Sequence, residues 1–246
     1  MINQSKIYVD TAEPRILAIV PAFNEEDSIE STIYDLRHNA PFVDILVIND
    51  GSSDSTEKRL EDLSVAHINL VKNLGIGGAV QTGYIYALQN NYDIAVQFDG
   101  DGQHDASYIR DLIQPIINGD ADAVIGSRFI EEKDGFKSSF MRRTGINILS
   151  TVLKLASGNR IIDVTSGFRA VNKKAVELFA NYYPDDYPEP EALAFLSRKG
   201  FRIAEVPVSM NERTGGSSSI KRLDSVYYMI KVTMAILIQT NIYERR

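Results

Sequence analysis

Residues 94–104 read Ile-Ala-Val-Gln-Phe-Asp-Gly-Asp-Gly-Gln-His, so an apolar run passes directly into a loop of carboxylates, glycines and an amide. The run at 94–98 is typical of a buried strand in a parallel sheet. Ligands of open parallel sheets bind outside the carboxyl ends of the strands. The polar residues that follow each such run are therefore the candidates for a functional site.

Short apolar runs alternate with helical patterns on either side of this stretch. Strands are predicted at residues 16–20, 44–49, 66–71, 94–98 and 123–126, and helices at 24–39, 56–63, 78–90 and 107–117. This alternation predicts an α/β fold with a mostly parallel, Rossmann-like sheet and helices on both faces. The remaining expected elements are helices at 144–157 and 189–199, a strand at 203–208 and a C-terminal amphipathic helix at 220–246.

The composition is that of a globular protein. The chain has 246 residues, a formal charge of −7, 44% hydrophobic and 24% charged residues, which excludes disorder and fibrous repeats. Cysteine is absent, which excludes disulfides and thiolate metal sites. The acidic balance argues against nucleic acid as a partner, because its recognition needs a basic face. No signal peptide and no run of roughly 18 apolar residues is present, so we expect a cytoplasmic protein.

The loop after residue 98 carries the ligands of a hard cation. Asp99 and Asp101 lie two residues apart, and Gln103 follows them. Oxygen ligands of this kind suit Mg²⁺ or Mn²⁺, which keep several waters and bind substrate phosphates. A simple turn is the structural alternative, and the position directly after a strand favours the metal. His104 is expected to be structural, because cations bound to a diphosphate prefer oxygen.

Two more polar loops follow the first two predicted strands. In Pro-Ala-Phe-Asn-Glu-Glu at 21–26, Asn24 is expected to cap a helix. In the loop that begins at Asp50, Asp54 and Glu57 have the spacing of a capping box. That spacing leaves Asp50 unexplained. A carboxylate at this position can accept from a base N–H or a ribose hydroxyl, and a simple turn residue is the alternative.

A glycine-rich segment and several arginines complete the candidates. Residues 73–79 read Asn-Leu-Gly-Ile-Gly-Gly-Ala, but the dinucleotide-binding fingerprint needs Gly or Ala where Val80 stands. Close approach of this backbone to a ribose or to the sheet is the interpretation we favour. Guanidinium groups pair bidentately with phosphate, so arginines around the acidic loop would form a site for more than one phosphate. The candidates are Arg128, Arg142, Arg143, Arg169 and Arg213.

Taken together, the motifs resemble those of the family 2 inverting glycosyltransferases, which have a GT-A fold. The closest branch is similar to dolichyl-phosphate mannose synthase and the bacterial polyprenyl-phosphate glycosyltransferases. The resemblance runs from about residue 15 to residue 219. It is carried by the order and spacing of PAFNEE at 21–26, VINDGSSDST at 47–56, QFDGDGQH at 97–104, GSR at 126–128, DVTSGFRA at 163–170, EVPV at 205–208 and ERTGGSSS at 212–219.

The resemblance implies roles on the donor side. The base and ribose of a sugar nucleotide would contact Pro21, Phe23, Glu25 and Asp50. The divalent cation that bridges the diphosphate, Mg²⁺ or Mn²⁺, would be bound by Asp99, Asp101 and Gln103. Arg213 would close over the donor diphosphate, and Ser219 stands where the mannose synthases have a lysine. That departure puts one phosphate contact in doubt.

On the acceptor side the resemblance implies Arg128 facing the donor or acceptor phosphate and Arg143 facing the acceptor phosphate. Glu191, ahead of Glu189, lies where the family places an acid near the acceptor. A single GT-A domain is expected at 1–219, with a nucleotide-sugar half at about 15–105 and an acceptor half at 106–219.

The expected function is metal-dependent, inverting transfer of a hexose from a nucleotide sugar, with a UDP-sugar favoured, to a polyprenyl phosphate in cell-envelope glycan synthesis. An anionic phosphate attacks without a base, which suits a chain rich in arginine at these loops. The first alternative is extension of a polysaccharide at a sugar hydroxyl, with Glu191 as the base. The others are a sugar-phosphate nucleotidyltransferase and a non-catalytic nucleotide-binding module.

The C-terminal segment at 220–246 has five basic and two acidic residues, a net charge of +3 in an acidic chain. Its apolar residues fall broadly at helical spacing. An interfacial helix at the inner face of the cell membrane is therefore predicted. Docking on a small membrane-protein partner, packing on the domain and pairing in a homo-oligomer are the alternatives.

Overall fold

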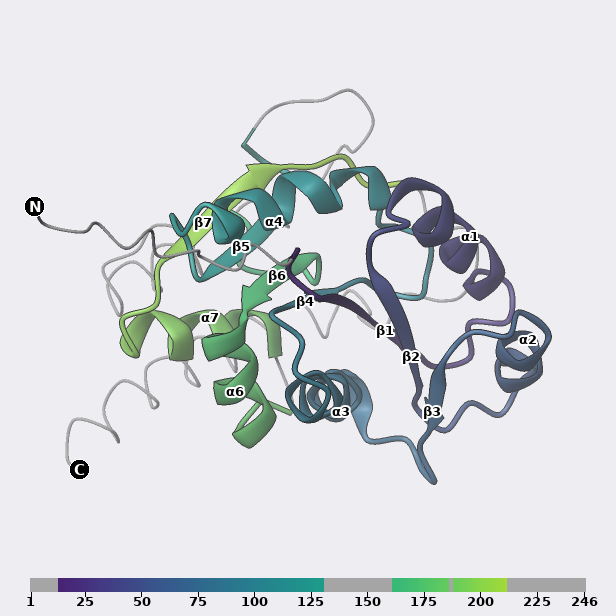
Figure 1. The fold of residues 1–246 in the computed structure, drawn as a ribbon. Helices are drawn as coiled ribbons and strands as arrows, with labels where there is room; N and C mark the ends of the chain where they lie inside the picture. Colours follow the sequence, from purple (N-terminus) through teal and green to yellow (C-terminus); the bar gives the residue numbers. More distant parts are fainter. Residues whose placement is uncertain (1–12, 131–160, 186–187, 212–246) are drawn as a thin grey trace, which may run out of the picture.

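The computed structural model describes residues 13–130, 161–185 and 188–211, and Figure 1 shows their arrangement. A seven-stranded sheet runs through these residues in the order β3-β2-β1-β4-β6-β5-β7. All of its pairings are parallel except those of β6, which is antiparallel to both β4 and β5. The strands are β1 (Ile16–Ala22), β2 (Asp44–Asn49), β3 (His67–Asn69), β4 (Ile94–Gln97), β5 (Ala123–Ser127), β6 (Arg169–Asn172) and β7 (Ile203–Pro207).

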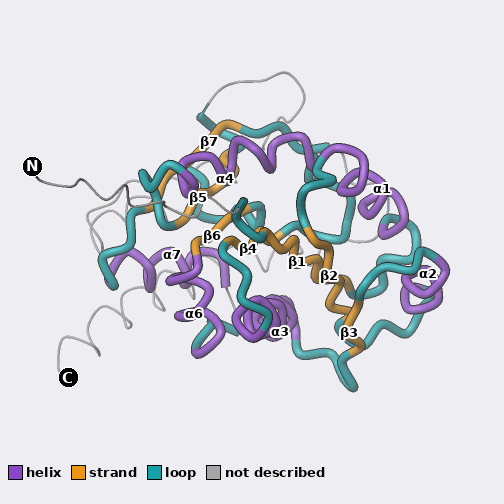
Figure 2. The backbone as a smooth tube through the Cα atoms, in the orientation of Figure 1, coloured by secondary structure: helices purple, strands orange, loops and turns teal. Residues whose placement is uncertain are grey.

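Helices cover both faces of the sheet, as Figures 1 and 2 show. The α/β, mostly parallel fold class is therefore confirmed. One face packs against α1 (Ile29–Asn39), α2 (Thr56–Asp62), the short 3₁₀ helix η1 (Ala106–Tyr108) and α4 (Ile109–Ile117). The other face packs against α3 (Gly75–Gln89), α6 (Lys173–Asn181) and α7 (Pro188–Arg198).

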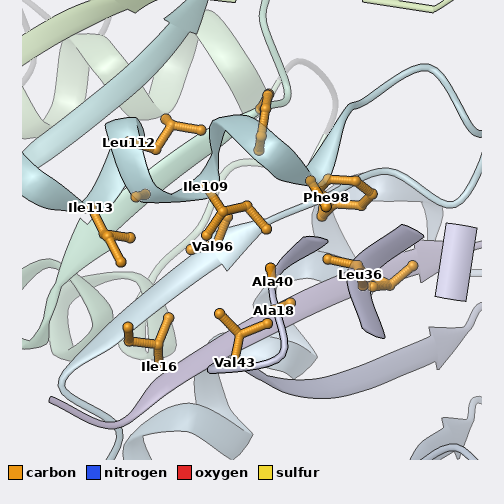
Figure 3. Close-up of a cluster of buried hydrophobic side chains, with 14 of the residues drawn as sticks. Ile16, Ala18, Leu36, Ala40, Val43, Val96, Phe98, Ile109, Leu112 and Ile113 are labelled. Atoms are coloured by element: carbon orange, nitrogen blue, oxygen red, sulfur yellow. The ribbon is translucent and has the colours of Figure 1, made fainter. Parts of the chain in front are cut away.

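The central strands are buried on both sides, which explains their unbroken apolar sequences. In β1, Ala18 and Val20 pack with the first set of helices, whereas Leu17 and Ile19 pack with the second. Figure 3 shows part of the first core, with Val96 of β4 near the side chains of α4. This rigid double-sided core fixes the strand ends, and the strand ends place the polar loops.

Two helix starts were predicted too early or with the wrong cap. Helix α1 begins at Ile29 with Ser28 as its N-cap residue. Asn24 does not cap it, because Asn24 has a φ of 56° and its side chain accepts a hydrogen bond from the Ser53 backbone N–H instead. The capping-box spacing of Asp54 and Glu57 does not mark the start of α2 either, because Ser55 is its N-cap residue, and Glu57 accepts from the Asn69 side chain.

The antiparallel strand β6 and helix α6 were not predicted. The strand reads Arg-Ala-Val-Asn, too short and too polar at its ends to stand out as an apolar run. The predicted helix at 144–157 and the C-terminal helix at 220–246 lie outside the described residues, as do Arg143, Arg213 and Ser219. Within the described ranges, none of the helices has the length and apolarity needed to cross a membrane.

Candidate active site

The candidate residues gather at one edge of the sheet. Strands β1, β2, β4 and β5 all run in the same direction, so their carboxyl ends meet there. Two backbone hydrogen bonds connect the loops that follow them: Asp50 N donates to Ala22 O (2.8 Å), and Gly100 N donates to Pro21 O (3.2 Å). The loops predicted to bind the nucleotide and the metal are therefore held side by side.

Asp50 joins the end of β2 to the start of α3. Its carboxylate is buried and accepts from Leu74 N at 2.7 Å and from Gly75 N at 2.9 Å. Burial raises the pKa of the Asp50 carboxyl, and these two hydrogen bonds oppose that rise. A contact of Asp50 with a base or a ribose, through the remaining lone pairs, stays a prediction.

The loops after β1 and β2, which are predicted to line the nucleotide site, are hydrogen-bonded to each other. Glu25 N donates to Thr56 Oγ1 at 2.9 Å, and Ser55 N donates to a Glu26 carboxylate oxygen at 3.0 Å. Phe23 remains 47% exposed in the first of these loops. An exposed aromatic ring on a fixed loop suits stacking or edge contact with a base.

Helix α1 fixes the position of the acidic loop. The hydroxyls of Ser28 and Thr32 lie 2.9 and 3.2 Å from the Gly100 carbonyl oxygen and donate to it. The Ser28 hydroxyl also lies 2.7 Å from a Glu25 carboxylate oxygen. The loop that carries the two aspartates is thus attached to the loop that carries Glu25.

His104 is structural, as predicted. Its ring is buried and stacks on Phe168, with ring centroids 4.7 Å apart. Nδ1 accepts a hydrogen bond from Asp99 N at 3.0 Å, which leaves the proton of the neutral ring on Nε2. Burial lowers the pKa of His104, and the nearby Asp99 and Asp101 oppose this effect. The neutral ring therefore stabilises the acidic loop through its hydrogen bond with the Asp99 backbone.

The acidic loop offers oxygen ligands of the kind that Mg²⁺ and Mn²⁺ prefer. The Asp99 side chain is 32% exposed, and one Asp101 oxygen accepts from Gln103 N at 3.1 Å. No cluster of three or more His, Cys, Asp or Glu side chains that could hold a metal occurs in the described part of the chain. Mg²⁺ is commonly bound through one or two carboxylates plus substrate phosphates. The residues present therefore fit such a cation.

Sequence reasoning missed the residues that surround Asp99. Gln97 Nε2 donates to Asp99 Oδ1 at 3.2 Å, and the buried Tyr183 hydroxyl lies 3.4 Å from Gln97 Oε1. A Cβ atom on Gly167 would lie only 2.7 Å from Asp99 Oδ2. Only the glycine within the SGF motif hinted at this close approach, because a sequence does not show which segment packs beside a loop.

Arg128 lies at this edge, but its hydrogen-bonding fork is already used by the protein. Its Nε and Nη2 atoms both contact the Asp163 carboxylate at 2.7 Å, and Nη2 also donates to Thr165 Oγ1 at 3.0 Å. The sequence led us to expect that Arg128 binds a phosphate with two hydrogen bonds. Nε and Nη2 are not available for this, because they bind Asp163. Among the contacts of the described residues, the Nη1 edge is the part of this guanidinium that remains for a ligand.

Arg169 is not a phosphate ligand, contrary to the expectation for it. Its side chain is among the largest fully buried ones in the described chain. Nη2 donates to Ser166 O at 2.6 Å, and Nη1 donates to Glu189 O at 3.3 Å. The residue therefore ties β6 to the start of α7 rather than facing a substrate.

Glu189 and Glu191 lie in the first turn of α7. Glu191 is 9% exposed. Burial raises the pKa of the Glu189 carboxyl, and the Arg169 cation opposes that rise. The charge of the nearby Asp99 adds to the rise in the pKa of Glu189, and the charge of Arg128 opposes it. An acid therefore lies near the acidic loop, while a contact of either glutamate with an acceptor stays a prediction.

The chain belongs to glycosyl transferase family 2, whose model matches residues 17–179. It is 33% identical over 216 residues to the UDP-N-acetylglucosamine–dolichyl-phosphate N-acetylglucosaminyltransferase of Methanococcus voltae, covering 80% of this chain and 86% of that protein. It is 30% identical to the undecaprenyl-phosphate mannosyltransferase of Micrococcus luteus, with 84% and 87% covered. The protein is therefore a glycosyltransferase, and its relatives support the polyprenyl-phosphate sugar transferase branch.

A solved structure confirms the GT-A fold. Glucosyl-3-phosphoglycerate synthase from Mycobacterium tuberculosis, in complex with Mn²⁺, UDP-glucose and phosphoglyceric acid, matches with a TM-score of 0.69. The match covers 93% of this chain and 80% of that chain at 22% identity. A structure of the same synthase with Mg²⁺ and UDP matches with a TM-score of 0.67. At this level of identity the likeness concerns the fold alone.

Proposed function

We propose that this glycosyltransferase moves a hexose from a nucleotide sugar, with a UDP-sugar favoured, to the phosphate of a polyprenyl phosphate. The observation that carries the proposal is the arrangement of one sheet edge. The acidic loop lies at its centre, after β4, with Asp50 on the side of β2 and Arg128 on the side of β5. The names of the relatives support the same acceptor class.

The strand order supports separate donor and acceptor regions along the chain. The donor would bind over residues 15–105, where β1, β2 and β4 end, and the acceptor over 106–219, within one GT-A domain at 1–219. Arg143, Arg213 and Ser219, all outside the described residues, would complete the phosphate contacts. Phe23 and Asp50 would hold the base and ribose, together with Pro21 and Glu25.

The chemistry is a single displacement with inversion. A phosphate oxygen of the acceptor attacks the anomeric carbon, the bond from that carbon to the donor diphosphate breaks, and its electron pair leaves with the nucleoside diphosphate. A cation held by Asp99, Asp101 and Gln103 would supply charge neutralisation at that diphosphate. The acceptor phosphate is already anionic, so no side chain has to remove a proton. Arg128 would orient the nucleophile.

The proposal also places the enzyme in the cell. A polyprenyl phosphate stays in the bilayer, so the protein would work in the cytoplasm at the inner face of the membrane, in cell-envelope glycan synthesis. Attachment would come from 220–246 or from a small membrane-protein partner. Nucleic acid is not an expected partner, because the chain carries a net charge of −7.

The test is a panel of nucleotide sugars offered with undecaprenyl phosphate and either Mg²⁺ or Mn²⁺. We expect one labelled sugar to appear in a lipid phosphate product, and we expect Asp101→Asn to abolish transfer while keeping the fold. The variant loses a ligand charge rather than a packed side chain. Full activity of Asp101→Asn in the presence of EDTA, or no lipid product with any donor, would overturn the proposal.

A hydroxyl acceptor on a growing polysaccharide is the second candidate, and the two acids in the first turn of α7 favour it. A hydroxyl nucleophile needs a base, and the nearly buried Glu191 in the first turn of α7 is the candidate. Glu191→Gln separates the two functions. We expect transfer to lipid phosphate to stay within about fivefold of wild type, because a phosphate needs no base. Near-complete loss of turnover with donor binding intact would favour the hydroxyl acceptor.

A further inference from the structure

The strongest unassigned feature is the buried carboxylate of Asp163. Its side chain is 0% exposed, and that of Arg128 is 8% exposed. The two make a two-point ion pair with both N···O distances at 2.7 Å, and Arg128 N also donates to Asp163 Oδ2 at 3.1 Å. The side chain and the backbone of Arg128 are therefore held by the same carboxylate.

The ion pair is itself supported from the edge strand β7. The two carboxylate oxygens of Glu205 accept from Ile162 N at 2.8 Å and from Asp163 N at 2.9 Å. Thr165 closes the arrangement from the other side, with its hydroxyl 3.0 Å from Arg128 Nη2. An ordinary surface ion pair has no such surrounding hydrogen bonds. These bonds, together with the ion pair, form a network that fixes the Arg128 guanidinium in one orientation.

These contacts occupy two of the three nitrogen atoms of the Arg128 guanidinium. Nε and Nη2 are occupied, and within the described residues the Nη1 hydrogens have no acceptor. Two residues before Arg128, Gly126 N donates to Phe168 O at 2.8 Å, and the Phe168 ring stacks on His104, which is hydrogen-bonded to Asp99 N. Arg128 therefore lies beside the acidic loop. Strands β6 and β5 lie beyond β4 on the side away from the nucleotide loops. A phosphate that approached the donor from that side would have the Nη1 edge as its contact with Arg128.

We propose that Asp163 is a positioning residue, which locks Arg128 so that its Nη1 edge meets the acceptor phosphate. The carboxylate also neutralises the guanidinium, so Arg128 contributes a directed hydrogen bond rather than a free positive charge. A directed donor orients the nucleophile without holding the anion so strongly that it loses reactivity. The inference deepens the proposed function and rests on it.

Asp163→Asn is the first test. The amide places an N–H group against the guanidinium fork, so the two-point pair breaks and Arg128 can turn. With a short-chain polyprenyl phosphate as the probe, we expect the acceptor KM to rise at least tenfold or kcat to fall by a similar factor. The donor KM and the affinity for UDP, measured by calorimetry, should stay within twofold of wild type.

A matched control exists at the opposite ends of the same strands. Asp122, just before β5, makes a similar two-point pair with Arg202, with both N···O distances at 3.1 Å. That pair is remote from the site edge, so Asp122→Asn should leave the acceptor KM unchanged. Thr165→Val is a milder variant for the case that Asp163→Asn does not fold. It removes one hydrogen bond to Nη2 and should raise the acceptor KM two- to fivefold.

A double-mutant cycle separates positioning from simple structural support. If Asp163 acts through Arg128, Asp163→Asn should cost little acceptor kcat/KM in an Arg128→Lys background, where the fork is already lost. Additive losses in the cycle, or an unchanged acceptor kcat/KM in both Asp163→Asn and Thr165→Val, would overturn the inference. Failure of the wild-type protein to use any polyprenyl phosphate would instead overturn the proposed function.

Discussion

The carboxylate of Asp99 is confined by neighbours from separate segments of the chain. Gln97 donates to one oxygen, and the protonated nitrogen of His104 lies 3.6 Å from the other. Gly167 approaches the same oxygen so closely that a methyl group there would displace it. At the scale of the residue, contacts with these neighbours therefore restrict the position of the Asp99 carboxylate, the proposed metal ligand.

Gly167→Ala should thus impair catalysis without unfolding the protein. The added Cβ would lie 2.7 Å from Asp99 Oδ2, and the carboxylate, which is partly exposed, would swing away from it. We expect activity to fall at least tenfold and the concentration of Mn²⁺ needed for half-maximal activity to rise. Thermal melting should stay close to wild type. A variant with wild-type activity and metal dependence would show that Asp99 needs no fixed orientation.

Glu189 predicts a pH dependence of stability. Its folded pKa lies above the ordinary value of 4.5 because of burial, so the folded state binds the proton more tightly than the unfolded state. The contribution of this group to stability is greatest below pH 4.5 and is lost as the pH rises through the folded pKa. Glu189→Gln should remove that slope. Melting temperatures of both proteins from pH 4 to pH 8 test this, and parallel curves would contradict it.

Residue types were enough to predict that the acidic loop and Asp50 each follow a strand at the carboxyl edge of the sheet. They were not enough to predict contacts made across the fold. Arg169, a candidate phosphate ligand by sequence, is buried against α7. Asp163 was quoted within a motif without a role, because its partner Arg128 is distant in sequence. Pairings of this kind depend on which strands become neighbours.

At the scale of the element, α3 packs against β1 through a glycine. A Cβ on Gly83 would overlap Cγ2 of the buried Ile19. The helix therefore approaches the sheet more closely than any larger residue allows. Gly83 lies outside the glycine-rich segment at 73–79, where close approach to a ribose or to the sheet was expected. Within that segment Gly77 instead lies against the backbone of Pro184 and Asp185.

Gly83→Ala should destabilise the fold. Overpacking of a core costs about 1–3 kcal/mol, which outweighs the gain of about 1 kcal/mol from a better helix former. Gln89→Ala in the same helix is exposed and should change the free energy of unfolding by less than about 0.5 kcal/mol. Urea denaturation of both variants measures the difference. Equal stabilities would mean that α3 shifts freely on the sheet.

Strand prediction succeeded where burial on both faces gives a continuous apolar run, as in β1, β2, β4 and β5. It failed for β6, whose antiparallel direction no local pattern indicates. A four-residue strand bounded by Arg169 and Asn172 carries too little hydrophobic signal. The side of the sheet that would receive the acceptor was thus less predictable than the side of the nucleotide.

At the scale of the whole molecule, one sheet unites the loops assigned to the donor with those assigned to the acceptor. The strands from which these loops leave pack in the same two-sided core. Contact with the bilayer was assigned to 220–246, which lies outside the described residues. That assignment remains a prediction from charge and hydrophobic spacing.

Truncation after Ser219 tests this prediction. We expect UDP binding to be unchanged and use of a long-chain polyprenyl phosphate in liposomes to weaken at least tenfold, because basic residues near anionic lipid contribute about 1 kcal/mol each. The full chain should float with anionic liposomes, and the truncated chain should not. If the full chain does not float and truncation leaves lipid-dependent activity intact, the segment has no membrane role.

The central claim is that a lipid phosphate is the nucleophile. The most direct measurement offers the enzyme one labelled donor with either a polyprenyl phosphate or the matching polyprenol, which has the same chain and a hydroxyl in place of the phosphate. The account predicts that label enters the polyprenyl phosphate and that polyprenol receives no more than the background set by Asp101→Asn. Equal transfer to polyprenol, or transfer to sugar hydroxyls alone, would contradict it.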